Sequence, residues 1–183
     1  MRIWQLQFEV DKYDNLISVK EFSADELQSF DGRNKKEHWK PLAVKRMEPE
    51  KKLELGDAPG FMIPAFSKRA VEILHPLMCN SVEELELDFH EEEFWGINVV
   101  AVLDVIDYSK SKYKTYSDGK RIMLFEKYVF KICDDIIEHN IFKIAEERRR
   151  RAFVTEKFKQ AVEENHLTGF KFKLVWDSEN ELE

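Results

Sequence analysis

Asp104 and Asp107 are the residues whose types and spacing come nearest to a catalytic pair. Both stand at the end of an apolar run, and paired carboxylates can serve as general acid and base or hold a cation. In a strand, an odd offset sends two side chains to opposite faces, so the pair converges only if the backbone turns between them. We therefore predict structural roles, with Asp104 accepting buried hydrogen bonds and Asp107 capping the loop through Tyr108 and Ser109. A small carboxylate-dependent enzyme that uses both aspartates is the alternative.

Acidic residues crowd the segment from residue 83 to residue 93, and two aromatic residues follow it. A zinc-protease pattern needs a second histidine four residues after the first, but Phe94 stands four residues after His90. A run of charges is most often a solvated face, and the functional interpretation is an electrostatic docking patch. The residues that we predict to bind a partner are Glu83, Glu84, Glu86, Asp88, Glu91, Glu92, Glu93, Phe94 and Trp95.

Four consecutive arginines, Arg148 to Arg151, form a basic run that is suited to contact phosphate. Glu146 and Glu147 precede them, and the chain as a whole has a net charge of −7. A dedicated nucleic-acid surface normally adds further basic residues and exposed aromatic side chains. We therefore predict a solvated loop and no nucleic-acid partner, with a nucleic-acid-binding regulatory module as the second alternative. The sequence also lacks a phosphate-binding glycine loop and a GxSxG nucleophile turn, so we predict no cofactor and no metal.

The composition is that of a folded domain of ordinary size. The 183 residues are 43% hydrophobic and 13% aromatic, which is enough to build a sizeable core. We predict one domain over residues 1–183, with an internal boundary, if one exists, at residues 47–64, where prolines and glycines cluster. No run approaches the length of a membrane helix, and the first residues lack a signal-peptide apolar region. We therefore expect a cytoplasmic protein with no membrane partner.

The periodicity of apolar residues predicts an α+β fold, mainly an antiparallel sheet with two or three short packed helices. Ser67 should cap a helix that Pro76 ends, and Thr155 should cap a second helix. Gly169 then follows that helix, where a left-handed residue is easiest to place. The predicted strands are an opening hairpin of residues 3–10 and 16–22, a half-buried strand at 85–89, a central strand at 97–106 paired with 122–132, and two more at 141–144 and 170–174.

Several segments together resemble immunity protein family eleven of bacterial polymorphic toxin systems. The most specific of these segments begins at Ala152–Phe158 and continues through residues 161–165 and 168–172. Residues 66–74 look like the family's helix opening, and Leu103-Asp104 with Asp107 and Ser109 looks like its aspartate-containing strand end. The resemblance spans roughly residues 60–176 in broken pieces. It implies a cytoplasmic protein that binds and neutralises a cognate toxin domain, and it implies no catalytic residues.

These observations lead to one hypothesis, an immunity protein that neutralises a secreted toxin domain by stoichiometric occlusion and that is not an enzyme. The acidic balance suits a basic partner, because complementary charge speeds encounter and selects partners. Tight neutralisation also needs a buried anchor. We expect the stretch from Glu83 to Glu93 to provide the charge, and Phe94 and Trp95 at its end to provide the anchor.

Overall fold

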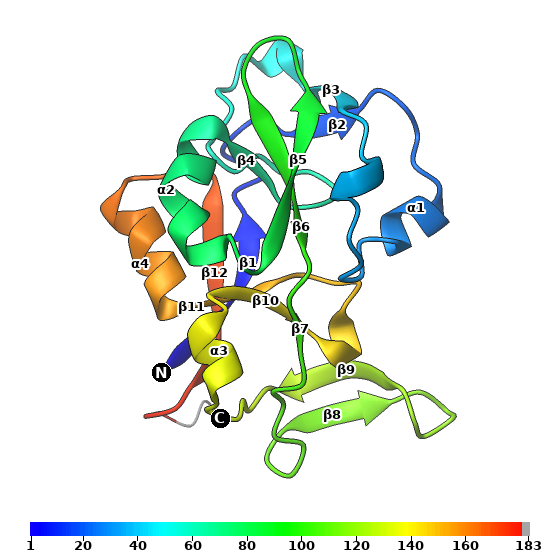
Figure 1. The fold of residues 1–183 in the computed structure, drawn as a ribbon, viewed down its shortest axis with the longest axis vertical. Helices are drawn as coiled ribbons and strands as arrows, with labels where there is room; N and C mark the ends of the chain where they lie inside the picture. Colours follow the sequence, from blue (N-terminus) through cyan, green and yellow to red (C-terminus); the bar gives the residue numbers. More distant parts are fainter. Residues whose placement is uncertain (181–183) are drawn as a thin grey trace.

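The computed structural model describes residues 1–180 and shows the predicted α+β fold, built on mixed and antiparallel sheets (Figure 1). The first five-stranded sheet has the order β12-β1-β11-β10-β7. Its neighbouring strands are antiparallel, apart from β7, which runs parallel to β10. The strands are β1 (Arg2–Phe8), β7 (Val102–Leu103), β10 (Ile141–Ile144), β11 (Phe153–Thr155) and β12 (Phe170–Asp177).

A second five-stranded sheet has the order β2-β3-β5-β6-β4, and a separate hairpin is made of β8 and β9. In the second sheet only β3 and β5 are parallel. Its strands are β2 (Leu16–Ser18), β3 (Leu42–Arg46), β4 (Ala65–Ser67), β5 (Val82–Asp88) and β6 (Phe94–Val99). The hairpin strands are β8 (Lys112–Thr115) and β9 (Ile122–Lys127).

Helices α2 and α4 lie side by side and cover the largest core cluster (Figure 1). That cluster joins Leu6 and Phe170 of the first sheet to Ile97 of the second sheet, so the two sheets share one core. The helices of the described chain are α1 (Ala24–Gln28), α2 (Lys68–Met78), α3 (Asp134–Glu138) and α4 (Glu156–Glu164), with short 3-10 turns at Lys36–His38, Pro49–Lys51 and Ala145–Glu147.

Ser67 caps α2 as predicted, since its hydroxyl accepts a hydrogen bond from the backbone N–H of Ala70 at 3.2 Å. The predicted end of the helix was wrong. Pro76 lies inside α2, which continues to Met78. Proline costs a helix one backbone hydrogen bond, but Met78 is fully buried in the core, and the N–H of Cys79 still reaches the carbonyl of His75 at 2.9 Å. The packing of the last turn therefore outweighs the missing bond.

Residues 141–177 form the short strands β10 and β11, then α4 and the final strand β12, which confirms the strands predicted at 141–144 and 170–174. Gly169 has φ +83°, and a Cβ there would lie 2.6 Å from the carbonyl oxygen of Ala58. Both the backbone conformation and the lack of space therefore require glycine. Thr155 stands at the N-cap of α4, but its hydroxyl bonds the side chain of Asn140 at 2.9 Å and does not cap the helix.

Two predicted strand pairings were wrong. Strand β1 pairs with β11 and β12, near the other end of the chain, and β2 pairs with β3, so no opening hairpin forms. The predicted central strand at 97–106 divides into β6 of the second sheet and β7 of the first. It meets residues 122–132 only at the isolated bridge between Ile106 and Phe130. Strand β9 pairs instead with its sequence neighbour β8.

Candidate functional site

The acidic hairpin, defined here as residues 83–95, consists of β5, the start of β6 and the turn between them. Strand β5 has the predicted alternation, with Leu85 and Leu87 buried and Glu86 and Asp88 exposed. The turn that follows contains Glu91, Glu92 and Glu93. It forms one end of the long axis of the molecule (Figure 1). The chain therefore brings together the exposed members of the predicted docking patch.

Most carboxylates of the acidic hairpin already have partners within the protein. Glu83 accepts hydrogen bonds from the backbone N–H of Lys35 at 2.6 Å and from the amide of Asn98 at 2.9 Å. Three further contacts are Glu84 with His75 at 2.9 Å, Glu91 with Arg46 at 2.7 Å, and Glu93 with Lys68 at 2.6 Å. Within residues 1–180, the side chains without such a partner are those of Glu86, Asp88 and Glu92.

The two aromatic residues predicted to anchor a partner, Phe94 and Trp95, face the protein and not the solvent. Phe94 is only 1% exposed and packs in the core with Phe89, at a ring separation of 6.0 Å. Trp95 is half-buried against the core cluster of α2 and α4. Phe94 therefore has no surface with which to anchor a partner, because strand alternation turns it inward together with Leu87, its partner in the β5–β6 register.

Asp107 has the role predicted for it, and Asp104 does not. Asp107 accepts hydrogen bonds from the hydroxyl of Ser109 at 2.6 Å and from its backbone N–H at 3.0 Å. The Ser109 hydroxyl, as the largest cause, lowers the pKa of the Asp107 carboxyl. Asp104 is exposed, so the prediction of a buried acceptor was wrong: the short strand β7 ends before it. No hydrogen bond or shared cation partner links the two aspartates within residues 1–180.

The four arginines form an exposed turn between β10 and β11, as predicted. Arg149 donates to the side chain of Gln28 at 3.1 Å, and Arg150 donates to Glu147 at 2.8 Å. The second amino group of Arg150 also reaches the carbonyl of Met123 on β9 at 2.8 Å. This contact places the arginine turn beside the β8–β9 hairpin, which comes from a different part of the chain.

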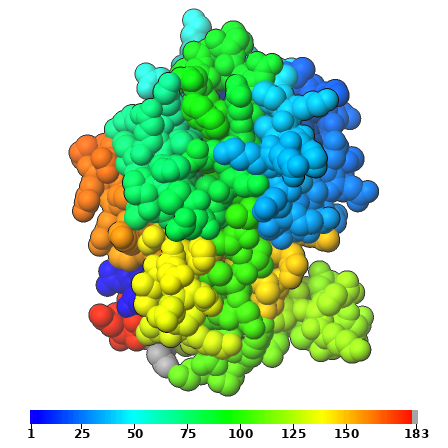
Figure 2. Space-filling model, in the orientation of Figure 1, coloured from blue at the N-terminus to red at the C-terminus, as the bar shows by residue number. Residues whose placement is uncertain are grey.

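The β8–β9 hairpin adds the further basic and aromatic residues that the arginine run lacks in the sequence. Figure 2 shows it as a lobe that projects from the body of the molecule. Three tyrosines in the hairpin and in the loop just before it are exposed by about two fifths: Tyr108 in the loop, and Tyr113 and Tyr116 in the hairpin. We did not predict these residues as a site. Their only sequence signal is the density of lysine and tyrosine in residues 108–121, which is also typical of an unstructured loop.

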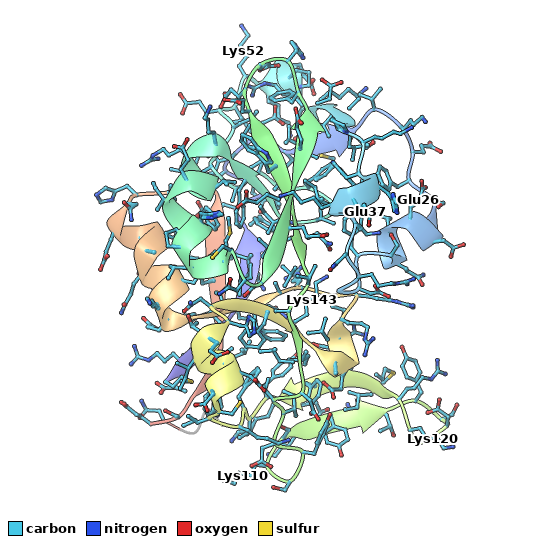
Figure 3. All side chains as sticks on the ribbon, in the orientation of Figure 1. Glu26, Glu37, Lys52, Lys110, Lys120 and Lys143 are labelled. Atoms are coloured by element: carbon cyan, nitrogen blue, oxygen red, sulfur yellow. The ribbon has the colours of Figure 1, made fainter. Side chains whose placement is uncertain are left out.

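A cleft of about 1180 Å³ lies on the other side of the arginine turn. Its lining includes Gln5 and Gln7 of β1, Phe125 of β9, Tyr128 just after that strand, and Lys143 of β10. Lys143 is 5% exposed and lies inside the fold (Figure 3), where its ammonium donates to the carbonyl of Phe30 at 2.5 Å. Burial lowers the pKa of Lys143 to about 8. The buried ammonium has lost its hydration, and a hydrogen bond to one carbonyl does not replace it. The neutral amine is therefore favoured, and the pKa falls.

Residues 1–180 contain no group of three or more His, Cys, Asp or Glu side chains arranged to hold a metal ion. Within the same residues, no helix has both the length and the apolar composition needed to span a membrane.

The structure thus combines an α+β fold with two oppositely charged, exposed surfaces. The comparison with family models identifies the family. The model of the Immunity protein family (Imm11) matches residues 82–177, which is more than half of the chain, and the protein therefore belongs to this family. No curated protein matches the chain. The matched segment contains the acidic hairpin, both aspartates and the arginine turn, whereas the first 81 residues lie outside it.

Proposed function

We propose that this protein is an immunity protein that binds a cognate secreted toxin domain and neutralises it by stoichiometric occlusion. Membership of the Immunity protein family over residues 82–177 is the observation that carries the proposal. The geometry of Asp104 and Asp107 adds support, because one is exposed and the other is held by Ser109, which is not the arrangement of a carboxylate pair that shares a substrate or cation. Such a protein acts in the cytoplasm of the cell that it protects.

The acidic hairpin is the surface that we propose to meet the toxin domain first. Its carboxylates without a partner in residues 1–180 are those of Glu86, Asp88 and Glu92, and the turn of the hairpin stands at one end of the molecule (Figure 1). A cluster of exposed charge raises the rate of encounter with an oppositely charged surface, and this effect weakens as salt rises. The proposed partner therefore presents a basic face to this end of the protein.

Occlusion requires more than encounter, because tight complexes depend on a few well-packed anchors at the centre of the interface. The acidic hairpin has none to offer, since Phe94 is 1% exposed and Trp95 is half-buried. Its contribution is therefore to the rate of association, and the anchor lies elsewhere on the protein.

Co-expression tests the proposal directly. A candidate toxin domain, sought in the neighbouring reading frame, is expressed from an inducible promoter, alone or together with this protein. We expect growth arrest in the first case, growth in the second, and co-purification of the two chains. As a control, the same toxin domain is paired with a truncated chain that ends at residue 81, before the family segment begins. Growth arrest that persists in the presence of the full-length folded protein would contradict the proposal.

A further inference from the structure

The positive charge of this acidic protein is concentrated in one place. We name residues 108–131 and the arginine turn 148–151 the basic arm. Residues 108–131 contain seven lysines and arginines against two carboxylates, and the turn adds four arginines. The basic arm thus carries a formal charge of +9 on a chain whose net charge is −7, so the rest of the chain carries −16. Figure 3 shows Lys110 and Lys120 at the outer edges of this region.

Much of this charge is free to act on a partner. Four cations of the basic arm have a carboxylate partner, namely Lys110, Lys114, Arg121 and Arg150. The other seven have no such partner within residues 1–180, and they are Lys112, Lys120, Lys127, Lys131, Arg148, Arg149 and Arg151. Exposed cations without a local counter-charge produce a field that extends to about a Debye length, roughly 8–10 Å in physiological salt.

A groove of about 720 Å³ runs between the two parts of the basic arm. Tyr108, Tyr113 and Tyr116 stand on the hairpin side, and Arg148 and Arg149 stand on the side of the turn. Two carboxylates also line the groove, and both are engaged within the protein: Glu146 accepts from the hydroxyl of Tyr108, and Glu147 accepts from Tyr128 and Arg150. Tyrosine and arginine are the side chains most enriched at the energetic centres of protein interfaces, because each combines a large contact area with hydrogen-bonding groups. The groove therefore offers the anchors that the acidic hairpin lacks.

The two walls of the groove are held in place before any partner arrives. Tyr113 packs on Phe125 at 5.8 Å, Phe125 stacks on Tyr128 at 4.8 Å, and Tyr128 packs on the fully buried Phe153 at 5.4 Å. This row of rings ties the hairpin to the core. The bond from Arg150 to the carbonyl of Met123 ties the arginine turn to β9. A preorganised surface loses less conformational entropy on binding, which favours affinity.

We infer that this groove is the anchoring site for an acidic segment of the toxin domain, an inference that rests on the proposed function. Aspartate and glutamate side chains of that segment pair with the free cations that line the groove, Lys120, Arg148 and Arg149, while its apolar atoms pack against the three tyrosines. A polypeptide suits the site better than a nucleic acid does. An extended phosphate backbone would continue past the groove and meet the rest of the chain, which carries −16.

A charge-reversal variant with a matched control tests the inference. The arm variant carries Lys112→Glu, Lys120→Glu and Arg148→Glu, at exposed positions without a carboxylate partner in the described residues. The control variant carries Lys20→Glu, Lys36→Glu and Lys40→Glu, which change the net charge equally but lie far from the arm in sequence, at exposed positions. Binding of the immobilised toxin domain is measured by surface plasmon resonance at physiological salt, after circular dichroism has verified folding of each variant.

We expect the arm variant to raise koff for the toxin domain at least about thirty-fold, the size of effect seen at interface hot spots, and the control to change it little. Equal koff for the arm variant and the wild type would overturn the inference while leaving the proposed function intact. Failure of the wild type itself to bind would instead overturn the proposed function.

A labelled dT20 oligonucleotide serves as the second probe. Its binding by the wild type, lost in the arm variant while toxin binding is unchanged, would assign the groove to nucleic acid and overturn the inference.

Discussion

The acidic hairpin and the basic arm carry opposite charges, but they differ in how much of that charge a partner can reach. The segment 83–93 contains seven carboxylates, and four of them are engaged by Lys35, Asn98, His75, Arg46 and Lys68. The basic arm leaves seven of its eleven cations without a carboxylate partner in residues 1–180. The aromatic residues differ in the same sense, since Phe94 is 1% exposed whereas Tyr116 is 44% exposed.

This difference separates two contributions to binding, one to the association rate and one to the dissociation rate, which a count of charges does not distinguish. Charge that is exposed but not backed by packing surface raises the association rate and selects partners. Charge that stands beside exposed tyrosines lowers the dissociation rate as well, because water is excluded around the ion pairs. We therefore assign the approach of the toxin domain to the acidic hairpin and its retention to the basic arm.

Removal of two tyrosine rings from the groove should have the largest effect. We expect Tyr113→Ala combined with Tyr116→Ala to raise koff by about one to two orders of magnitude, because large aromatic anchors carry most of an interface's energy. Stopped-flow or surface plasmon resonance with the toxin domain measures it. The matched control is Tyr→Phe at both positions, which keeps the rings and should recover most of the affinity. A koff of the alanine variant equal to that of the wild type would show that the basic arm does not anchor the toxin domain.

Reversal of the free carboxylates of the acidic hairpin should have a smaller effect, and on a different rate. We expect Glu86→Lys, Asp88→Lys and Glu92→Lys together to lower kon about five-fold at low salt and to leave koff nearly unchanged. The difference should shrink as salt is raised. Glu21→Lys, Glu37→Lys and Glu164→Lys, at exposed positions elsewhere, form the charge-matched control. A change confined to koff would show that the acidic hairpin anchors the partner and does not steer it.

Lys143 provides a test of the distinction between buried and exposed cations. Its pKa is about 8 in the folded protein, below the ordinary value of 10.5, so between these values the unfolded chain binds more protons than the folded one. Stability contributed at this position therefore rises with pH across that window. We expect the free energy of unfolding of the wild type, relative to Lys143→Met, to increase from pH 8 to pH 10.5 in urea titrations. A flat difference would mean that Lys143 keeps its charge at an ordinary pKa.

The aspartate pair should show the smallest effect on neutralisation. We expect Asp104→Asn to leave both protection and stability unchanged, because Asp104 is exposed. Asp107→Asn should weaken the loop held by Ser109 and lower the melting temperature slightly, with protection retained. Growth assays with the toxin domain and thermal unfolding measure the two properties. Loss of protection in a folded Asp104 variant would instead favour the carboxylate-dependent enzyme.

Local features of the fold could be predicted from the sequence because their causes are local. Ser67 caps α2 through a bond to a residue three positions away, and Gly169 is required by its own φ. The alternation of Leu85 and Leu87 with acidic residues likewise identified β5. Strand partners could not be predicted in this way. Strand β1 pairs with β11 and β12 through backbone groups that any sequence carries, and only the packing of the whole chain selects them.

The candidate site shows the same limit. The acidic run was visible in the sequence, but the internal partners of Glu83, Glu84, Glu91 and Glu93 come from other elements, 9 to 48 positions away, and no local pattern predicts them. The arginine run was equally visible. Its neighbours in the groove, the three tyrosines, lie more than 30 positions away from Arg148, the first arginine of the turn. A spatial cluster built from separate segments has no single sequence motif.

Titration of toxin activity tests the central claim most directly. The activity of a fixed amount of the toxin domain is measured while this protein is added in increasing amounts, at concentrations well above Kd. Stoichiometric occlusion predicts that activity falls linearly and reaches zero at about one equivalent, with no further change over time. Complete loss of activity at a small fraction of one equivalent, progressing with time, would show a catalytic protein and contradict the account.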